Sequence, residues 1–66
     1  MIRHWRIRYN DRDEYVMTTD GKGSQLEQVV KHCVLHRYAL NSVTVLETAT
    51  KFVHEPLLKY IKEAIQ

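Results

Sequence analysis

Bulky apolar and cationic side chains alternate at the start of the chain, and this pattern constrains the fold more than any other feature. The odd positions hold Trp5, Ile7 and Tyr9, and the even positions hold His4, Arg6 and Arg8. A two-residue period is typical of a β-strand with one buried face. We therefore predict a strand over residues 2–9 that buries its aromatic side and exposes a basic row.

A second strand is predicted after a polar turn. Residues 10–14 read NDRDE, a composition that favours a turn. Residues 15–19 read YVMTT, and their β-branched and aromatic side chains favour a returning strand. We expect Tyr9 to pair with Tyr15, which places Tyr15 and Met17 on the apolar face of the hairpin. A slip of one residue would move both side chains to the other face.

The apolar period changes to that of a helix after residue 24. Residues 20–23, DGKG, interrupt the strand pattern, and Ser24 followed by Glu27 matches the S-x-x-E capping box of a helix start. One stripe at helical spacing then runs to about residue 39 and contains Leu26, Val29, Val30, Cys33, Val34 and Arg37. We predict an amphipathic helix that covers the apolar face of the hairpin.

A third strand and a second helix complete the predicted fold. Residues 43–49 alternate as a strand, with Val43 and Val45 on one face, whereas residues 51–55, KFVHE, match neither period clearly. Pro56 suits the first turn of a final helix. The apolar stripe of that helix consists of Leu57, Leu58, Ile61 and Ile65. The predicted fold is α+β with the order ββαβα: a three-stranded antiparallel sheet, strand order 2-1-3, with the first helix on one face and a C-terminal helix.

Length and composition bound the classes of protein to which the chain can belong. The 66 residues make a single domain (residues 1–66) with a thin core, and such small domains often gain stability from a partner. Cys33 is the single cysteine, so no internal disulfide can form and a reducing, cytoplasmic location is expected. We expect neither a membrane span nor a secretory signal, because no apolar run is long enough. The net charge of +2 falls short of the strongly basic balance of dedicated DNA-binding domains.

No set of residues forms a catalytic or metal-binding signature. His32 and His36 have the i, i+4 spacing of a zinc-ligand pair, but no second pair accompanies them, so two surface histidines are the simpler interpretation. Residues 20–24, DGKGS, lack the longer motif of a phosphate-binding loop. Cys33 lies in the predicted core stripe, where a thiol is inert. We therefore predict a protein without catalytic residues, cofactor or metal.

The basic face of the hairpin has three interpretations. In the expected register this face carries His4, Arg6, Arg8, Val16, Thr18, Thr44 and Leu46. It lacks the exposed aromatic rings on which single-stranded RNA stacks, and a charged row opposite an apolar one is most often a solvated strand face. The alternatives are contact with nucleic-acid phosphates and contact with another protein. The candidate binding residues are Arg3, His4, Arg6, Arg8 and Lys22.

The final helix needs a partner for its apolar side. Because the first helix already closes the predicted core, the final helix would fold back over the open sheet face or pack against another chain. Pairing with a second copy would bury more apolar area. We expect a homodimer whose interface contains Leu35, Leu57, Leu58, Ile61 and Ile65.

The order of these segments resembles that of small phage and prophage proteins. WRIRY, EYVMTT, the capped helix SQLEQVVKHCVLH and VTVLE follow the ββαβ order of that group, which includes host-takeover inhibitors of bacterial RNA polymerase. The resemblance covers residues 3–48 and assigns no functional residue. It implies a regulatory protein that occupies a surface on a larger host or phage protein. Our leading hypothesis is therefore protein–protein contact through the basic face or an edge strand, and the alternative is weak contact with nucleic acid.

Overall fold

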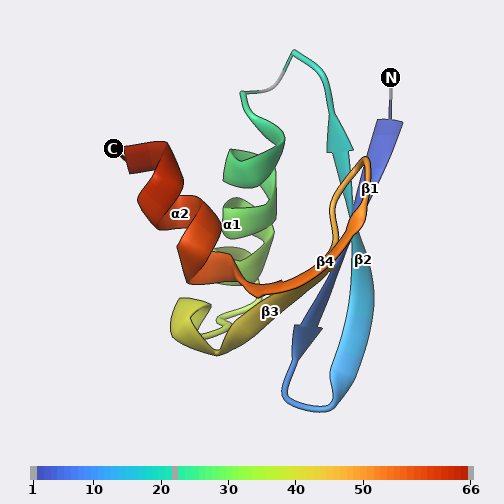
Figure 1. Cartoon of the computed structure of the whole chain (residues 1–66). Helices are drawn as coiled ribbons and strands as arrows, with labels where there is room; N and C mark the ends of the chain where they lie inside the picture. The colour runs from blue at the N-terminus through green and yellow to red at the C-terminus, as the bar shows by residue number, and fades with distance from the viewer. Residues whose placement is uncertain (1, 22, 66) are drawn as a thin grey trace.

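Two helices cover one face of a four-stranded antiparallel sheet (Figure 1) in the computed structural model, which describes residues 2–21 and 23–65. The elements are β1 (Ile2–Tyr9), β2 (Arg12–Thr19), α1 (Gln25–Leu35), a short 3-10 helix (Leu40–Ser42), β3 (Val43–Glu47), β4 (Phe52–Pro56) and α2 (Leu57–Ile65). The strand order is β2-β1-β3-β4. The predicted α+β class, the antiparallel sheet and the two helices are confirmed. The predicted number of strands is wrong, because the sheet has four and not three.

The fourth strand lies in the segment whose sequence pattern is ambiguous. β4 follows β3 through a tight connection in which the Thr48 N–H donates to the Lys51 carbonyl at 2.9 Å. The pairing of β3 with β4 shifts register between Val45 and Glu47, and His54 has a φ of 53°. Such irregularities interrupt the two-residue period that identifies a regular strand. β4 therefore becomes recognisable only once β3 lies beside it.

The β1–β2 hairpin turns in two residues rather than five. β2 begins at Arg12, which pairs with Tyr9, so Asn10 and Asp11 alone form the turn. Asn10 has a φ of 55°, the left-handed conformation that a two-residue hairpin turn requires and that asparagine tolerates. The closing of the chain at Asn10 therefore sets the register of the whole hairpin.

This register corrects the predicted faces of β2. Tyr15 pairs with Arg6 and not with Tyr9, a shift of three residues. Because an odd shift exchanges the two faces of a strand, Val16 and Thr18 are buried beneath the helices, whereas Tyr15 and Met17 are exposed on the opposite face.

The core lies between the sheet and the two helices. Its buried side chains are Trp5, Ile7, Val16, Val29, Cys33, Val43, Val45 and Leu57. The predicted burial of Trp5 under the first helix is confirmed: its indole N–H donates to Gln25 Oε1 in α1 at 3.0 Å. Its ring also meets Tyr60 of α2 edge-on, with 5.8 Å between the ring centroids. Both helices therefore pack on Trp5.

Side-chain hydrogen bonds attach α1 to the end of β2. The Glu27 N–H donates to Ser24 Oγ at 3.1 Å, as the capping pattern predicts. The side-chain amide of Gln28 accepts from the Thr19 N–H at 2.9 Å and donates to the Thr19 carbonyl at 2.7 Å. These bonds satisfy backbone groups at the edge of the sheet, so they fix the start of α1 against β2.

The C-terminal end of α1 comes four residues earlier than predicted, at Leu35. Arg37 adopts a φ of 60°, and the Tyr38 N–H donates to the Cys33 carbonyl at 2.9 Å. This is a Schellman arrangement, which usually has glycine at the left-handed position. Because arginine occupies that position, the sequence carries no clear stop signal.

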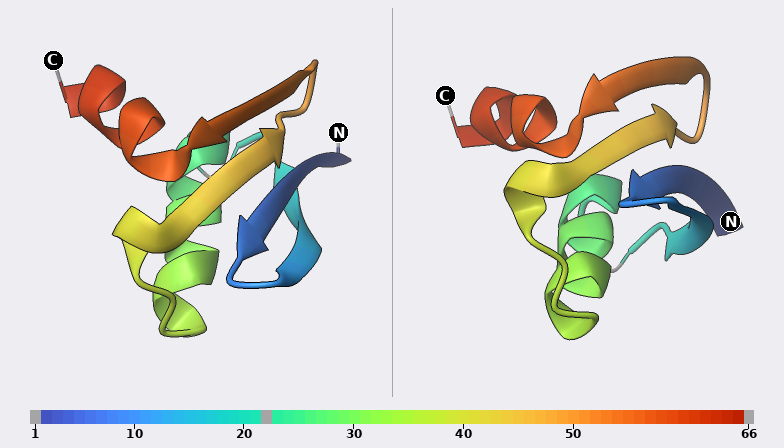
Figure 2. Two further views of the ribbon diagram at one scale, coloured as in Figure 1. Left: turned by 60° about the horizontal axis from the view of Figure 1, so that its bottom comes forward. Right: turned by 90° about the horizontal axis from the view of Figure 1, so that it is seen from below.

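The helix α2 lies beside α1 on the same side of the sheet, where it contacts β3 and β4 (Figure 2). We expected this helix to pack on the sheet face that the first helix leaves uncovered, or against another chain, and it does neither. The fourth strand widens the sheet, and the covered face thereby accommodates a second helix. Leu57, at the start of α2, is fully buried in the core. Within the described residues, no helix has the length and apolar character needed to cross a membrane.

Candidate functional site

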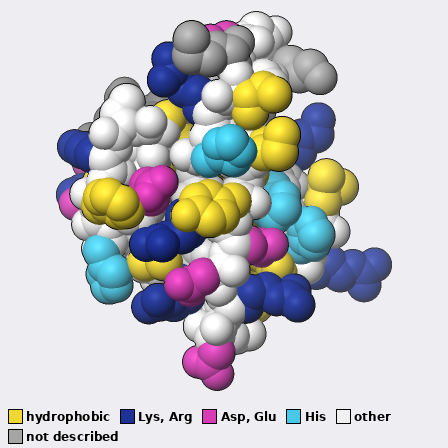
Figure 3. All heavy atoms as spheres, turned by 90° about the vertical axis from the view of Figure 1, so that its right-hand side faces the viewer, with side chains coloured by type: hydrophobic (Ala, Val, Ile, Leu, Met, Phe, Trp, Pro, Cys, Tyr) yellow, Lys and Arg dark blue, Asp and Glu magenta, His cyan; other side chains and the backbone are white. Residues whose placement is uncertain are grey.

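The sheet face that the helices leave uncovered carries the candidate site, and we call it the open face (Figure 3). Residues that pair across neighbouring strands project from the same face of a sheet and interact there. The side chains of the open face therefore form cross-strand rows. The central row crosses all four strands and consists of Tyr15, Arg6, Glu47 and Phe52. The flanking rows contain the pairs Met17–His4 and Asp13–Arg8.

Among the described residues, four large apolar side chains are exposed on the open face. Ile2 is 56% exposed, Tyr15 58%, Met17 61% and Phe52 75%. Figure 3 shows hydrophobic side chains interspersed with cationic and histidine side chains on this side of the molecule. Single exposed apolar residues are common on protein surfaces, but a group of aromatic, methionine and arginine side chains is the composition that is enriched in protein interfaces.

The aromatic rings of the open face lie next to a cationic or imidazole side chain. The guanidinium carbon of Arg6 lies 6.0 Å from the centroid of the Phe52 ring, at the outer limit of a cation–π interaction. The His4 ring meets the Tyr15 ring edge-on, with 6.1 Å between centroids. The four side chains therefore lie within interaction distance in two neighbouring pairs, Arg6 with Phe52 and His4 with Tyr15.

Carboxylates offset much of the positive charge on the open face. Arg8 forms two hydrogen bonds with Asp13, Nε to Oδ1 at 2.6 Å and Nη2 to Oδ2 at 3.1 Å. The hydrogen bond from Arg8 lowers the pKa of Asp13, so the carboxylate stays ionised at neutral pH. Glu47 is the cross-strand neighbour of Arg6 in the register of β1 and β3. The face is therefore less basic than β1 alone suggests.

The structure separates the predicted cationic residues. His4, Arg6 and Arg8 lie on the open face, whereas Arg3 pairs with Thr18 and projects from the helix-covered face. Lys22 lies outside the described residues. The open face therefore keeps the predicted basic row of β1 but does not include Arg3.

Sequence reasoning placed some residues on the wrong face. Val16 and Thr18, expected on the open face, are buried on the other side. Tyr15, Met17 and Phe52 are exposed side chains of the open face that sequence reasoning did not place there. The signal that could have found Tyr15 and Met17 is Asn10, which suits a two-residue turn.

The predicted dimer-interface residues have different degrees of burial. Leu57 is fully buried within its own chain, Leu58 and Ile61 are half-buried, and Leu35 and Ile65 are exposed. The start of α2 therefore serves the core of its own chain. Of these five residues, only Ile65 at the end of α2 and Leu35 at the end of α1 have largely exposed side chains.

A second polar cluster joins β2 to α1 and to the segment after it. The Tyr38 hydroxyl donates to Glu14 Oε1 at 2.5 Å, and His32 Nε2 lies 3.6 Å from Glu14 Oε2. The ring of His36 lies 4.3 Å from that of His32, and Tyr9 stacks on Tyr38 with 4.4 Å between centroids. His32 is therefore a partly buried partner of Glu14, and only His36 is a surface histidine as predicted.

The predicted chemistry of Cys33 is consistent with its surroundings. Its side chain is fully buried, and burial together with the nearby Glu14 charge raises the pKa of the thiol to about 11. It is therefore a neutral thiol at physiological pH, and thiols in this form are poor nucleophiles. Within residues 2–21 and 23–65, no three histidine, cysteine or acidic side chains are arranged to hold a metal ion.

We expect the stability that Glu14 contributes to depend on pH. Burial by itself raises the pKa of Glu14. The hydrogen bond from Tyr38 and the interactions with His32 and His36 lower it, and together they outweigh burial, so the pKa in the folded chain lies below 4.5. A carboxyl with a lowered folded pKa stabilises the chain fully above its unfolded pKa and loses that contribution as pH falls through the folded value. Glu14→Gln should therefore cost about 1 kcal/mol near neutral pH.

The measurement is thermal unfolding of wild type and Glu14→Gln from neutral pH to below pH 4.5. The difference between the two proteins should shrink below pH 4.5, the ordinary pKa of the group. Tyr38→Phe serves as a companion variant, because it removes the hydroxyl donor and leaves the carboxyl in place. A difference that stays constant, or grows, as pH falls would contradict the prediction.

No protein-family model matches the chain, and no curated protein or solved structure is significantly similar to it. The resemblance to small phage proteins therefore stays a prediction from the order of the elements. The function has to be argued from the surfaces of this chain.

Proposed function

We propose that the chain is a small non-enzymatic binding protein that acts by protein–protein contact through the open face. The observation that carries this proposal is the exposure of Tyr15, Met17 and Phe52 around Arg6 on one side of the sheet. Aromatic and arginine side chains contribute most of the energy in many protein interfaces. The strands fix the backbone positions of these side chains, so a partner would have to order the side chains but not the backbone.

The charges on the open face favour a protein over a nucleic acid. Glu47 stands between Arg6 and Phe52 in the central row, and Asp13 pairs with Arg8. A phosphate backbone would meet both carboxylates as well as the two arginines. A protein surface can match such mixed charges with its own, and complementary charges of this kind give specificity.

Nucleic-acid binding is the second candidate because Tyr15 and Phe52 are exposed rings on a sheet. The two rings lie on the edge strands, three strand spacings apart, or about 14 Å at 4.8 Å per spacing. Neighbouring stacked bases would not reach both rings. We therefore rank this function second.

The partner is expected to be a larger protein with apolar pockets and mixed charge. Tyr15 and Met17 on β2 and Phe52 on β4 would enter such pockets, with Arg6 between them. If the resemblance to host-takeover proteins holds, this partner is a host or phage protein and the chain regulates it by occupying its surface.

The test is a pull-down with the tagged full chain, with and without nuclease, followed by titration of the captured partner. We expect Tyr15→Ser combined with Phe52→Ser to weaken binding by at least about tenfold, because exposed anchor side chains are lost. Leu35→Ser is the matched control, since Leu35 is about as exposed as Phe52 but lies at the end of α1 and lines neither the open face nor the groove between the helices. Circular dichroism should show all three proteins folded.

Two outcomes would contradict the proposal. Equal binding by wild type and the double variant would exclude the open face as the contact surface. Capture that disappears with nuclease, together with an affinity that falls steeply with added salt, would support nucleic acid instead.

A further inference from the structure

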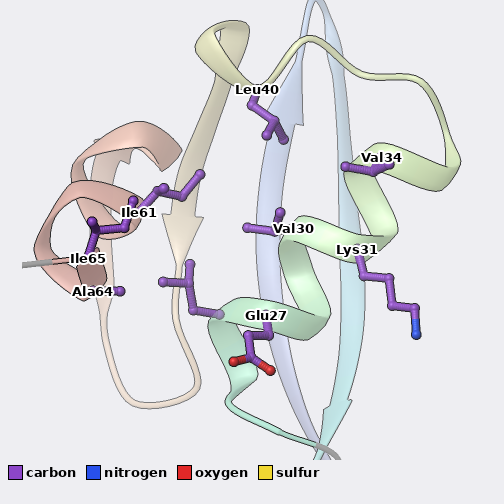
Figure 4. Close-up of a pocket in the computed structure, with 9 residues that line it drawn as sticks. Glu27, Val30, Lys31, Val34, Leu40, Ile61, Ala64 and Ile65 are labelled. Carbon is purple, nitrogen blue, oxygen red and sulfur yellow. The ribbon is translucent and has the colours of Figure 1, made fainter.

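A second apolar surface lies between the two helices, on the side of the molecule away from the open face (Figure 4). It is a groove of about 460 Å³. Its apolar lining consists of Leu26, Val30 and Val34 from α1, Leu40, and Ile61, Ala64 and Ile65 from α2. The two charged residues at the groove are Glu27 and Lys31. This surface is independent of the one used in the proposed function.

The apolar stripe of α1 continues beyond the core into this groove. Val30 is half-buried, but Val34, one turn further on, is 58% exposed. On the facing helix Ile61 is half-buried, whereas Ile65 is 78% exposed. Each helix therefore presents an apolar side chain to water at the rim of the groove, and covering both would be favourable.

The two charged residues at the groove, Glu27 and Lys31, are opposite in sign. Glu27 and Lys31 lie one turn apart on α1 and extend in different directions (Figure 4). Among the described residues, neither forms an ion pair with another side chain. A surface with one acid and one base flanking an apolar strip is complementary to itself when it is turned by 180°.

We propose that a second copy of this chain covers the groove, related by a two-fold axis that passes beside α1 between Glu27 and Lys31. This arrangement brings Glu27 of each copy next to Lys31 of the other, so both charges gain a partner. It also reverses the direction of α1, which places Val34 of each copy over the Leu26 and Ile65 end of the other groove. Closed two-fold pairs of this kind are the commonest soluble homo-oligomers.

The size of the molecule is sufficient for such an interface. A specific interface buries about 800 Å² per partner, which is about a sixth of the 4711 Å² accessible surface of this chain. The molecule measures 30 × 26 × 24 Å, so one face of this size can supply that area. The open faces of the two copies then point away from each other and both remain free to bind.

Charge exchange at the two positions tests the pairing by sedimentation equilibrium of the full chain. Wild type should be a dimer at micromolar concentration. Glu27→Lys alone brings four like charges together at the axis, and so does Lys31→Glu alone, so each should raise the dimer dissociation constant by about tenfold. The double variant Glu27→Lys/Lys31→Glu restores opposite charges across the axis and should return the constant to near the wild-type value.

Circular dichroism should show that all variants remain folded, since both side chains are exposed. A wild-type monomer at high micromolar concentration would overturn the proposal, and so would single variants that dimerise as well as wild type. Failure of the double variant to recover, with its fold intact, would show that the two charges do not meet across the interface. None of these outcomes bears on the Tyr15 and Phe52 test of the open face.

Discussion

Trp5→Ala should lower the free energy of unfolding by about 3–5 kcal/mol, the usual cost of removing a buried ring of this size. The ring packs edge-on against Tyr60 of α2, and its N–H donates to Gln25 of α1. Its loss would leave a cavity where the sheet and both helices meet. Small domains are stable by only about 5–15 kcal/mol in total, so this single change removes a large share of the stability.

Urea unfolding followed by circular dichroism measures this effect, and Phe52→Ala is the matched control. Phe52 is also aromatic but lies exposed on the open face, so its removal should change stability by less than about 0.5 kcal/mol. Similar losses for the two variants would contradict the burial of Trp5. The contrast also separates stability from binding, because Phe52 belongs to the proposed contact surface and Trp5 does not.

Leu57→Ala should destabilise the chain by about 2–5 kcal/mol, because Leu57 is the fully buried residue through which α2 reaches the core. The loss of its side chain would weaken the contact of α2 with β3 and β4. Hydrogen exchange should then show α2 amides that exchange faster than those of β1 and β3, since a loosely docked helix opens locally.

Leu35→Ala is the control for this prediction, since it is the same substitution at an exposed position at the end of α1. It should change stability by less than about 0.5 kcal/mol. Equal effects of the two substitutions, or unchanged exchange in α2, would show that α2 is not anchored through Leu57. That result would also remove one wall of the groove between α1 and α2.

The basic row of the open face follows from the sequence, but its aromatic members do not. His4, Arg6 and Arg8 share a face because alternate residues of one strand always do. Tyr15 and Phe52 join that row only through pairing with other strands. Their positions depend on where each hairpin turns, and an error of one residue there reverses a whole strand.

The features that the sequence alone determined depend on residues close together in the chain. The alternation around Trp5 and Ile7 specifies a strand with one buried face, and Ser24 specifies where α1 begins, because each signal acts within a few residues. The tertiary structure decided which face of β2 is buried, whether residues 52–56 form a strand and where α2 packs. These outcomes depend on partners distant in the sequence: β3 supplies the hydrogen bonds that make β4 a strand, and the widened sheet supplies the surface that Leu57 and α2 cover.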